Sequence, residues 1–117
     1  MMAAGAALRG GCEVTIFEAT DRLGKKLAIT GKGRCNITNN CDIDEFLRNV
    51  TKNQRFLYTA LNTLNPDGLI ELFSSLGVKT KVERGNRVFP ESDKAKTVVD
   101  ALRLYSEKAK KVYAKVK

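Results

Sequence analysis

The first eighteen residues change from a small-residue pattern to a short apolar pattern. Residues 1–8 include four alanines, and Gly10 with Gly11 follows as a helix stop. Residues 12–18 are then rich in β-branched and aromatic side chains, which are typical of a buried strand. The pattern therefore predicts a helix, a glycine turn and a buried strand that ends in the carboxylate of Glu18.

Three stretches in the middle of the chain are predicted to form helices. Residues 41–47 are typical of a helix start, with Asp42 as the N-cap and Glu45 at the capping-box position. Residues 54–64 repeat apolar side chains at helical spacing. Residues 65–77 begin with an Asn-Pro pair, which places a cap before a proline at the first helical position. We interpret the apolar faces of these helices as core.

The last third of the chain predicts a hairpin and a final helix. Apolar and charged side chains alternate over residues 78–90, around a two-residue turn at residues 85–86. Ser92 or Asp93 is expected to cap the final helix, whose apolar residues share one face. The lysine-rich residues 108–117 are interpreted as the frayed end of that helix.

Length and composition indicate one domain, and the order of the predicted elements places it in the α/β class. The chain has 117 residues, of which 43% are hydrophobic and 29% charged, as in ordinary globular proteins. No apolar run approaches the roughly 20 residues that cross a bilayer. We divide the domain into a dinucleotide-binding portion, a helical segment, a hairpin, and a helix with a basic tail, over residues 1–41, 42–77, 78–90 and 91–117.

Three cysteines and no histidine give the chain no pattern of metal ligands. An odd number of cysteines without an export signal indicates reduced thiols and a cytoplasmic protein. Cys35 follows Arg34, and two interpretations of it stay open. The neighbouring cation could lower the pKa of the thiol, or Cys35 could be a small packing residue.

The chain is strongly basic, with 21 Lys and Arg against 13 Asp and Glu and a net charge of +8. Such a balance favours anionic partners, namely nucleotides, nucleic acids or membrane surfaces. A small basic nucleic-acid-binding protein is therefore an alternative function. Against it, the five phenylalanines lie mostly in apolar stripes and not between basic residues, where they would stack on bases.

Residues 25–40 combine glycine, positive charge and hydrogen-bond donors in one stretch. Gly31 and Gly33 allow a tight backbone, and lysine and arginine side chains surround them. This combination is typical of a loop that wraps an anionic cofactor, although a basic solvated loop has the same composition. A P-loop is disfavoured, because six residues separate Gly24 from Gly31 and a glycine replaces the Ser or Thr after Lys32.

The predicted helix, turn, strand and terminal carboxylate match the second half of a dinucleotide-binding βαβ unit. In the complete unit, a strand and a G-x-G-x-x-G turn come first. An acid about 20 residues later then accepts hydrogen bonds from ribose hydroxyls. Glu18 suits that role if such glycines lie just before Met1.

Two parts of the chain resemble one bacterial flavoprotein family. The first is E-A-T-D-R-L-G-K-K-L at residues 18–27, followed by T-G-K-G-R-C-N-I-T-N at residues 30–39. The second is K-V-E-R-G-N-R-V-F-P at residues 81–90, followed by S-D-K-A at residues 92–95. Both are similar to the BaiN-like, aminoacetone oxidase-type family of NAD(P)/FAD-dependent oxidoreductases, and the resemblance extends over residues 1–105.

The resemblance implies a flavoprotein that carries FAD, with NAD(P)H as co-substrate and a small molecule of unknown identity as substrate. Glu18 would hold the adenosine ribose, and the residues after it would follow the cofactor towards the flavin. The resemblance assigns no catalytic residue. The cofactor-binding residues implied in this way are Glu18, Arg22, Gly24, Lys25, Lys26, Thr30, Gly31, Lys32, Gly33, Arg34, Cys35, Asn36 and Thr38.

Two departures from the family lead us to expect an N-terminal fragment. Family members open with a strand and a GGG-x-A-G turn before this helix, and they are several times longer. We therefore expect a partial Rossmann-like FAD-binding fold without its first strand and glycine-rich turn, followed by helices and a hairpin. Residues 14–17 would then lack a partner strand. Weak FAD affinity and no turnover by this chain alone are expected, and a non-functional remnant is a third alternative.

Overall fold

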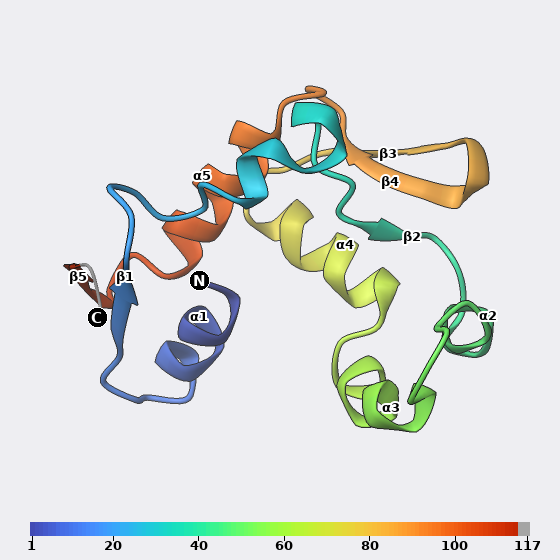
Figure 1. Ribbon diagram of the computed structural model, residues 1–117, viewed down its shortest axis with the longest axis horizontal. Coiled ribbons are helices and arrows are strands. Elements are labelled where there is room, and N and C mark those ends of the chain that lie inside the picture. Colours follow the sequence, from blue (N-terminus) through green and yellow to red (C-terminus); the bar gives the residue numbers. More distant parts are fainter. Residues whose placement is uncertain (115–117) are drawn as a thin grey trace.

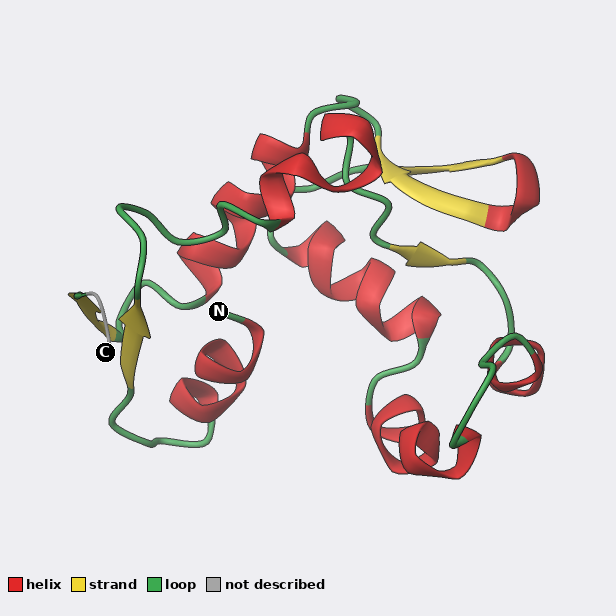
Figure 2. Ribbon diagram, in the orientation of Figure 1, coloured by secondary structure: helices red, strands yellow, loops and turns green. Residues whose placement is uncertain are grey.

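The small-residue N-terminus forms helix α1 (Met2–Arg9), and the apolar stretch after it forms strand β1 (Thr15–Glu18). These elements open the computed structural model, which describes residues 1–114. The others are η1 (Leu27–Gly33), β2 (Thr38–Asn39), α2 (Ile43–Arg48), α3 (Gln54–Thr63), α4 (Pro66–Ser75), β3 (Thr80–Glu83), η2 (Arg84–Asn86), β4 (Arg87–Pro90), α5 (Ala95–Tyr105) and β5 (Lys110–Tyr113). Figures 1 and 2 show an open arch in which α5 links the part containing β1 to the part containing β4. The predicted α/β class is confirmed.

A parallel pairing of β1 with β5 replaces the helical tail expected from the sequence. The Lys110 N–H donates to the Val14 carbonyl at 2.8 Å, at the start of this pairing. The expectation of a frayed helix end is wrong for β5, because β1 supplies backbone hydrogen-bond partners that are distant in the sequence. The expected tail also includes residues 115–117, which lie outside the described part of the chain.

Strand β1 is less buried than predicted. Phe17 is 70% exposed, and the residues of β1 alternate between exposed and half-buried. The prediction of a buried strand is therefore wrong, because a sheet of two strands leaves much of β1 uncovered. We expected residues 14–17 to lack a partner strand, and this is wrong for the edge of β1 that pairs with β5. The opposite edge of β1 pairs with no strand from residues 1–114.

The predicted N-caps of α2 and α4 are confirmed. The Asp42 carboxylate accepts a hydrogen bond from the Glu45 N–H at 2.7 Å. The Asn65 side chain accepts one from the Gly68 N–H at 2.8 Å, and Pro66 occupies the first helical position. Each cap satisfies a backbone donor that the first turn of a helix leaves free.

The prediction that the middle helices supply the core holds only for α4. Phe73 of α4 is 3% exposed and belongs to the core cluster. Helix α3 exists as predicted, but it has no buried residue, and Phe56 is 84% exposed. The interpretation of the α3 face as core is therefore wrong, because amphipathic spacing does not determine which element covers the apolar face.

The predicted hairpin is confirmed, but its turn has three residues and not two. Strands β3 and β4 pair antiparallel, with Glu83 opposite Arg87, so η2 forms the whole turn. Gly85 and Asn86 both have a left-handed backbone, with φ of 74° and 57°. The Asn39 side chain donates to the Gly85 carbonyl at 2.8 Å, and β2 adds to the sheet beside β4.

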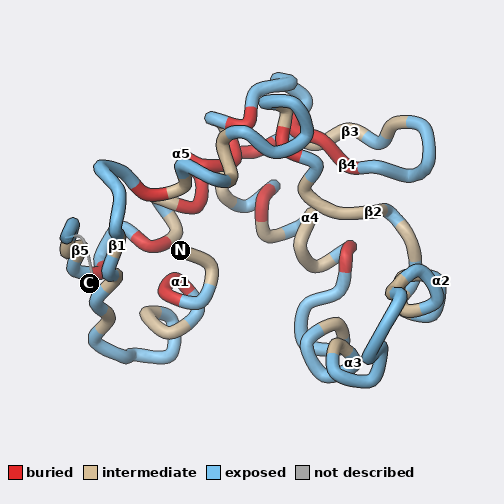
Figure 3. The backbone as a smooth tube through the Cα atoms, viewed as in Figure 1, coloured by how far each residue is buried: buried red, intermediate tan, exposed pale blue. Residues whose placement is uncertain are grey.

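Helix α5 begins after Lys94, and neither Ser92 nor Asp93 is its N-cap. The prediction of an Asp93 cap is wrong because the carboxylate of Asp93 binds Arg34 and Lys81. The apolar face expected for this helix is confirmed by its buried residues, and Figure 3 shows buried stretches along α5. No helix among residues 1–114 is long and apolar enough to cross a membrane.

The core cluster consists of Cys35, Phe73, Val78, Ala95, Val98, Ala101 and Leu102.

Gly5 of α1 packs against Tyr105 of α5, and this contact generates a test of the fold. A β-carbon at Gly5 would lie 1.9 Å from Cδ1 of the tyrosine ring, and Arg9 covers the same ring at 3.8 Å from its centroid. We expect Gly5→Ala to lower the free energy of unfolding by about 1–3 kcal/mol, although alanine is the better helix former. Urea titration followed by circular dichroism measures the change.

A double-mutant cycle provides the control for this contact. Because Tyr105→Ala removes the ring, Gly5→Ala should lower the free energy of unfolding much less in the Tyr105→Ala background than in the parent chain. The losses of the two single variants should therefore not add up in the double variant. Strictly additive losses would show that α1 and α5 do not pack through these two residues.

Candidate functional site

The stretch that the sequence singles out is a basic loop, residues 22–36, and its first half lies against α5. Gly24 has a φ of +80°, and a β-carbon there would lie 2.7 Å from a methyl carbon of Val99. The guanidinium of Arg103 donates to the Leu23 carbonyl at 2.8 Å across 80 positions of sequence. The start of the basic loop is therefore held by a close backbone approach and one long-range hydrogen bond.

The second half of the basic loop contains several residues with left-handed backbone. Gly31, Lys32 and Cys35 all have positive φ, and at Gly31 a β-carbon would lie 2.8 Å from the Asn36 nitrogen. Left-handed backbone is costly for lysine and cysteine, so other contacts must hold it. The N–H groups of Arg34 and Cys35 donate to carbonyls within the loop, at 3.1 and 3.0 Å, and so are already satisfied.

Arg34 supplies the contact that holds this backbone. Its guanidinium donates to Asp93 at 2.6 and 2.8 Å, and it also pairs with Glu83. The same guanidinium lies over the ring of Phe89, 4.1 Å from its centroid. Lys81 completes a four-charge cluster through a 2.6 Å contact with Asp93. Arg34 therefore ties the basic loop to the hairpin and to the segment before α5.

The four-charge cluster shifts the titration of its acids. The hydrogen bond from Arg34 is the main cause that lowers the pKa of Glu83 below its ordinary value. For Asp93, the hydrogen bond from Lys81 is the larger cause of a lowered pKa, and that from Arg34 is the second. Both carboxylates are therefore held ionised by Arg34, which is distant in the sequence, and by Lys81, which lies in the same strand as Glu83.

Cys35 lies directly beside this cluster and is 2% exposed. Burial is the main influence on its thiol and raises the pKa, although a hydrogen bond with Thr30 acts in the opposite direction. The interpretation as a thiol with a lowered pKa is therefore wrong, and the packing interpretation is confirmed. Cys35 belongs to the core under the basic loop.

Glu18 stands at the end of β1, where the chain turns towards the basic loop. Its carboxylate accepts a hydrogen bond from the Thr20 N–H at 2.8 Å, and this bond is the main cause that lowers its pKa. Thr20 also donates through its hydroxyl to the Arg22 carbonyl at 3.0 Å. An ionised carboxylate at this position can accept further hydrogen bonds from a ligand.

The other residues named from the sequence fall into three groups. Arg22, Gly24 and Lys25 line one side of a cavity of about 240 Å³ between the basic loop and α5. Thr30 donates to the Leu27 carbonyl at 2.7 Å, and Thr38 lies in β2 opposite Val88, so both have structural contacts. Lys26, Lys32 and Gly33 are exposed on the loop, and Asn36 is exposed beside it.

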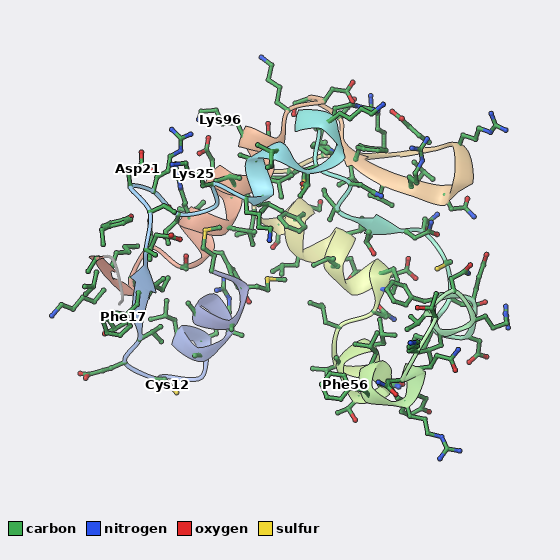
Figure 4. All side chains as sticks on the ribbon, viewed as in Figure 1. Cys12, Phe17, Asp21, Lys25, Phe56 and Lys96 are labelled. Carbon is green, nitrogen blue, oxygen red and sulfur yellow. The ribbon has the colours of Figure 1, made fainter. Side chains whose placement is uncertain are left out.

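The far wall of that cavity comes from α5 and was missed by sequence reasoning. It includes Lys96, Asp100 and Arg103, which repeat every three or four residues and have the appearance of a solvated helix face. Only contact with the basic loop distinguishes them, and no local signal reveals it. Figure 4 shows Lys96 on the same side of the molecule as Asp21 and Lys25. Within residues 1–114 no group of acids and cysteines could hold a metal ion.

The four-charge cluster predicts a loss of stability in acid. Because the pKa values of Glu83 and Asp93 are lowered on folding, their contribution is complete above the ordinary values of 4.5 and 3.8 and is lost as pH falls through the folded values. We expect the free energy of unfolding, measured by urea titration from about pH 6 to pH 3, to fall less steeply in Glu83→Gln/Asp93→Asn.

Glu71→Gln is the matched control, since it removes an exposed carboxylate of α4 and leaves the cluster intact. It should keep the slope of the parent chain. Equal slopes for all three proteins would contradict the role given to the cluster.

Comparison with known proteins identifies the family. The chain matches the family model of the HI0933-like protein Rossmann domain over residues 1–116. The 3-dehydro-bile acid delta(4,6)-reductase of Clostridium scindens is 36% identical over an alignment of 117 positions, and the alignment covers 92% of this chain and 26% of that protein. The chain thus spans about a quarter of the length of this relative. The family resemblance drawn from the two sequence runs is confirmed, and the chain belongs to the HI0933-like Rossmann domain family.

Proposed function

We propose that this chain binds FAD and forms the cofactor-binding portion of a flavin-dependent oxidoreductase. The observation that carries the proposal is the basic loop, which contacts of Arg103 and Arg34 attach to the rest of the domain and which follows the ionised carboxylate of Glu18. In α/β proteins, ligands bind beyond the carboxyl ends of parallel strands, which is where this loop begins. Membership of the family and a relative named as a reductase support the same conclusion.

The contacts suggest different roles for the residues of the loop. Glu18 would accept hydrogen bonds from the ribose hydroxyls, and Lys26 and Lys32 would contact phosphate oxygens as exposed cations. Arg34 and Cys35 would act indirectly, because their side chains are committed to the four-charge cluster and to the core. FAD, when bound, supplies the hydride chemistry, while these residues bind and orient it.

We further propose that the chain alone binds FAD weakly and does not turn over. Its radius of gyration is 15.1 Å, whereas a compact domain of this length has about 13 Å. One edge of β1 carries no strand from residues 1–114, and Phe17 is exposed beside it. A sheet of two strands gives the cofactor few fixed hydrogen-bond donors. A nicotinamide nucleotide as reductant, a small-molecule substrate and a cytoplasmic location are parts of the same proposal.

A titration with FAD tests cofactor binding. We expect saturable quenching of flavin fluorescence by the folded chain. Glu18→Gln should weaken the apparent affinity about tenfold, because a hydrogen bond to a charged acceptor is lost. Lys52→Gln, which changes one exposed cation outside the basic loop, should leave the affinity unchanged. Circular dichroism on the same samples establishes that each variant is folded.

Three results would count against the proposal. A folded chain with no flavin response contradicts cofactor binding. Stoichiometric tight binding with NAD(P)H oxidation contradicts weak affinity and absence of turnover. Binding of DNA that falls steeply with salt, without a flavin response, supports a nucleic-acid-binding protein instead.

A further inference from the structure

The cavity between the basic loop and α5 has a lining that the proposed function does not by itself explain. We propose that it is a binding site for a phosphate group, in which Lys96 and Arg103 of α5 act together with Arg22 and Lys25 of the loop. The inference rests on the proposed function in one respect, since the phosphates of FAD are one source of such a group.

Charge is the first argument for an anionic ligand. Four cations line the cavity, and the lining contains a single acid, Asp100. Asp21 pairs with Lys25 from outside the lining, at 3.0 Å. Two carboxylates against four cations leave a net charge of +2 around one concave surface, which attracts an anion more strongly than a flat surface of the same charge.

The cations are available because their present ion pairs are exposed. In the Lys96–Asp100 pair the two side chains are 79% and 44% exposed, and in the Arg103–Asp100 pair they are 40% and 44% exposed. Pairs of this kind contribute little to stability and exchange readily. Asp100 therefore occupies, as an internal competitor, the position that a phosphate would take between Lys96 and Arg103.

One of the four cations is already oriented. The hydrogen bond from Arg103 to the Leu23 carbonyl fixes its guanidinium at the rim of the cavity. Gly24 lies against Val99, so the loop and the helix cannot separate without losing this contact. The volume of about 240 Å³ accommodates a phosphate group with several waters, since one water occupies about 30 Å³.

Comparison with a larger cavity shows that size alone does not indicate this ligand. The cavity of about 470 Å³ between β2, α2 and the hairpin turn is lined by Cys41, Glu45, Asn49 and neighbours. Its single charged residue, Glu45, is an acid, so the lining supplies no cation to an anion. Of these two cavities, the smaller has the chemistry that matches a phosphate.

Binding of inorganic pyrophosphate tests the site directly. We would titrate the ¹⁵N-labelled chain at constant ionic strength and follow the amide signals. Gly24, Lys25, Lys96 and Arg103 are expected to shift together and to saturate. Arg22→Gln/Lys96→Gln should weaken binding about tenfold or more, since two charge-assisted contacts are lost. This double variant retains Arg103, so the hydrogen bond that attaches the loop to α5 is kept.

Two further variants make the result specific. Arg55→Gln/Lys52→Gln removes the same types of charge from the region of α3, so it should leave pyrophosphate affinity unchanged. Asp100→Asn removes the internal competitor and should strengthen binding several-fold. This gain cannot result from unfolding. Equal losses of pyrophosphate affinity in both double variants, or no gain of affinity with Asp100→Asn, would contradict the proposed site. The binding would then be non-specific electrostatic attraction.

FAD and riboflavin distinguish the source of the phosphate. If the FAD phosphates occupy the cavity, Arg22→Gln/Lys96→Gln weakens FAD binding and leaves the weaker riboflavin binding unchanged. If pyrophosphate behaves as expected but the chain binds no flavin, the site stands with a separate phosphorylated ligand and the proposed function fails. If FAD binds equally well to parent and variant and pyrophosphate does not bind, the proposed function stands and this site is wrong.

Discussion

The contacts of the Arg34 guanidinium are the constraint on which the rest of this structure depends. They join the basic loop to Glu83 of the hairpin and to Asp93 before α5, across 49 and 59 positions of sequence. An arginine fork between two carboxylates, stacked on Phe89, has little freedom to move. The left-handed backbone beside it is therefore kept in place, and Cys35 is kept buried beneath it.

Helix α5 organises both the core and the candidate site. Its apolar face carries Val98 and Leu102 into the core cluster, whereas its polar face turns Lys96 and Arg103 towards the basic loop. The loop follows α5 closely because glycine at position 24 allows the backbone to approach Val99. The same helix thus links stability to the geometry of the cations, so a substitution that moves α5 in the core would also move Lys96 and Arg103 at the site.

Sequence reasoning succeeded where the physical cause is local. The caps at Asp42 and Asn65 act within one helical turn, and both were predicted from side-chain chemistry alone. It failed where the partner is distant: β5 forms because β1 offers backbone groups, and α3 stays exposed because no described element covers Phe56. At the site, Glu18 and the basic loop were recognised from local signals, whereas Arg103 and the partners of Arg34 depend on tertiary contacts.

The reactivity of Cys35 tests most directly whether Arg34 holds the basic loop. In a Cys12→Ser/Cys41→Ser background, the rate of reaction with a disulfide reagent reports a single thiol. The account predicts slow modification of the parent and much faster modification of Arg34→Gln. Exposure of Cys35 would also remove the burial that raises its pKa. An unchanged rate in folded Arg34→Gln would show that the loop keeps its conformation without this arginine, and would contradict the account.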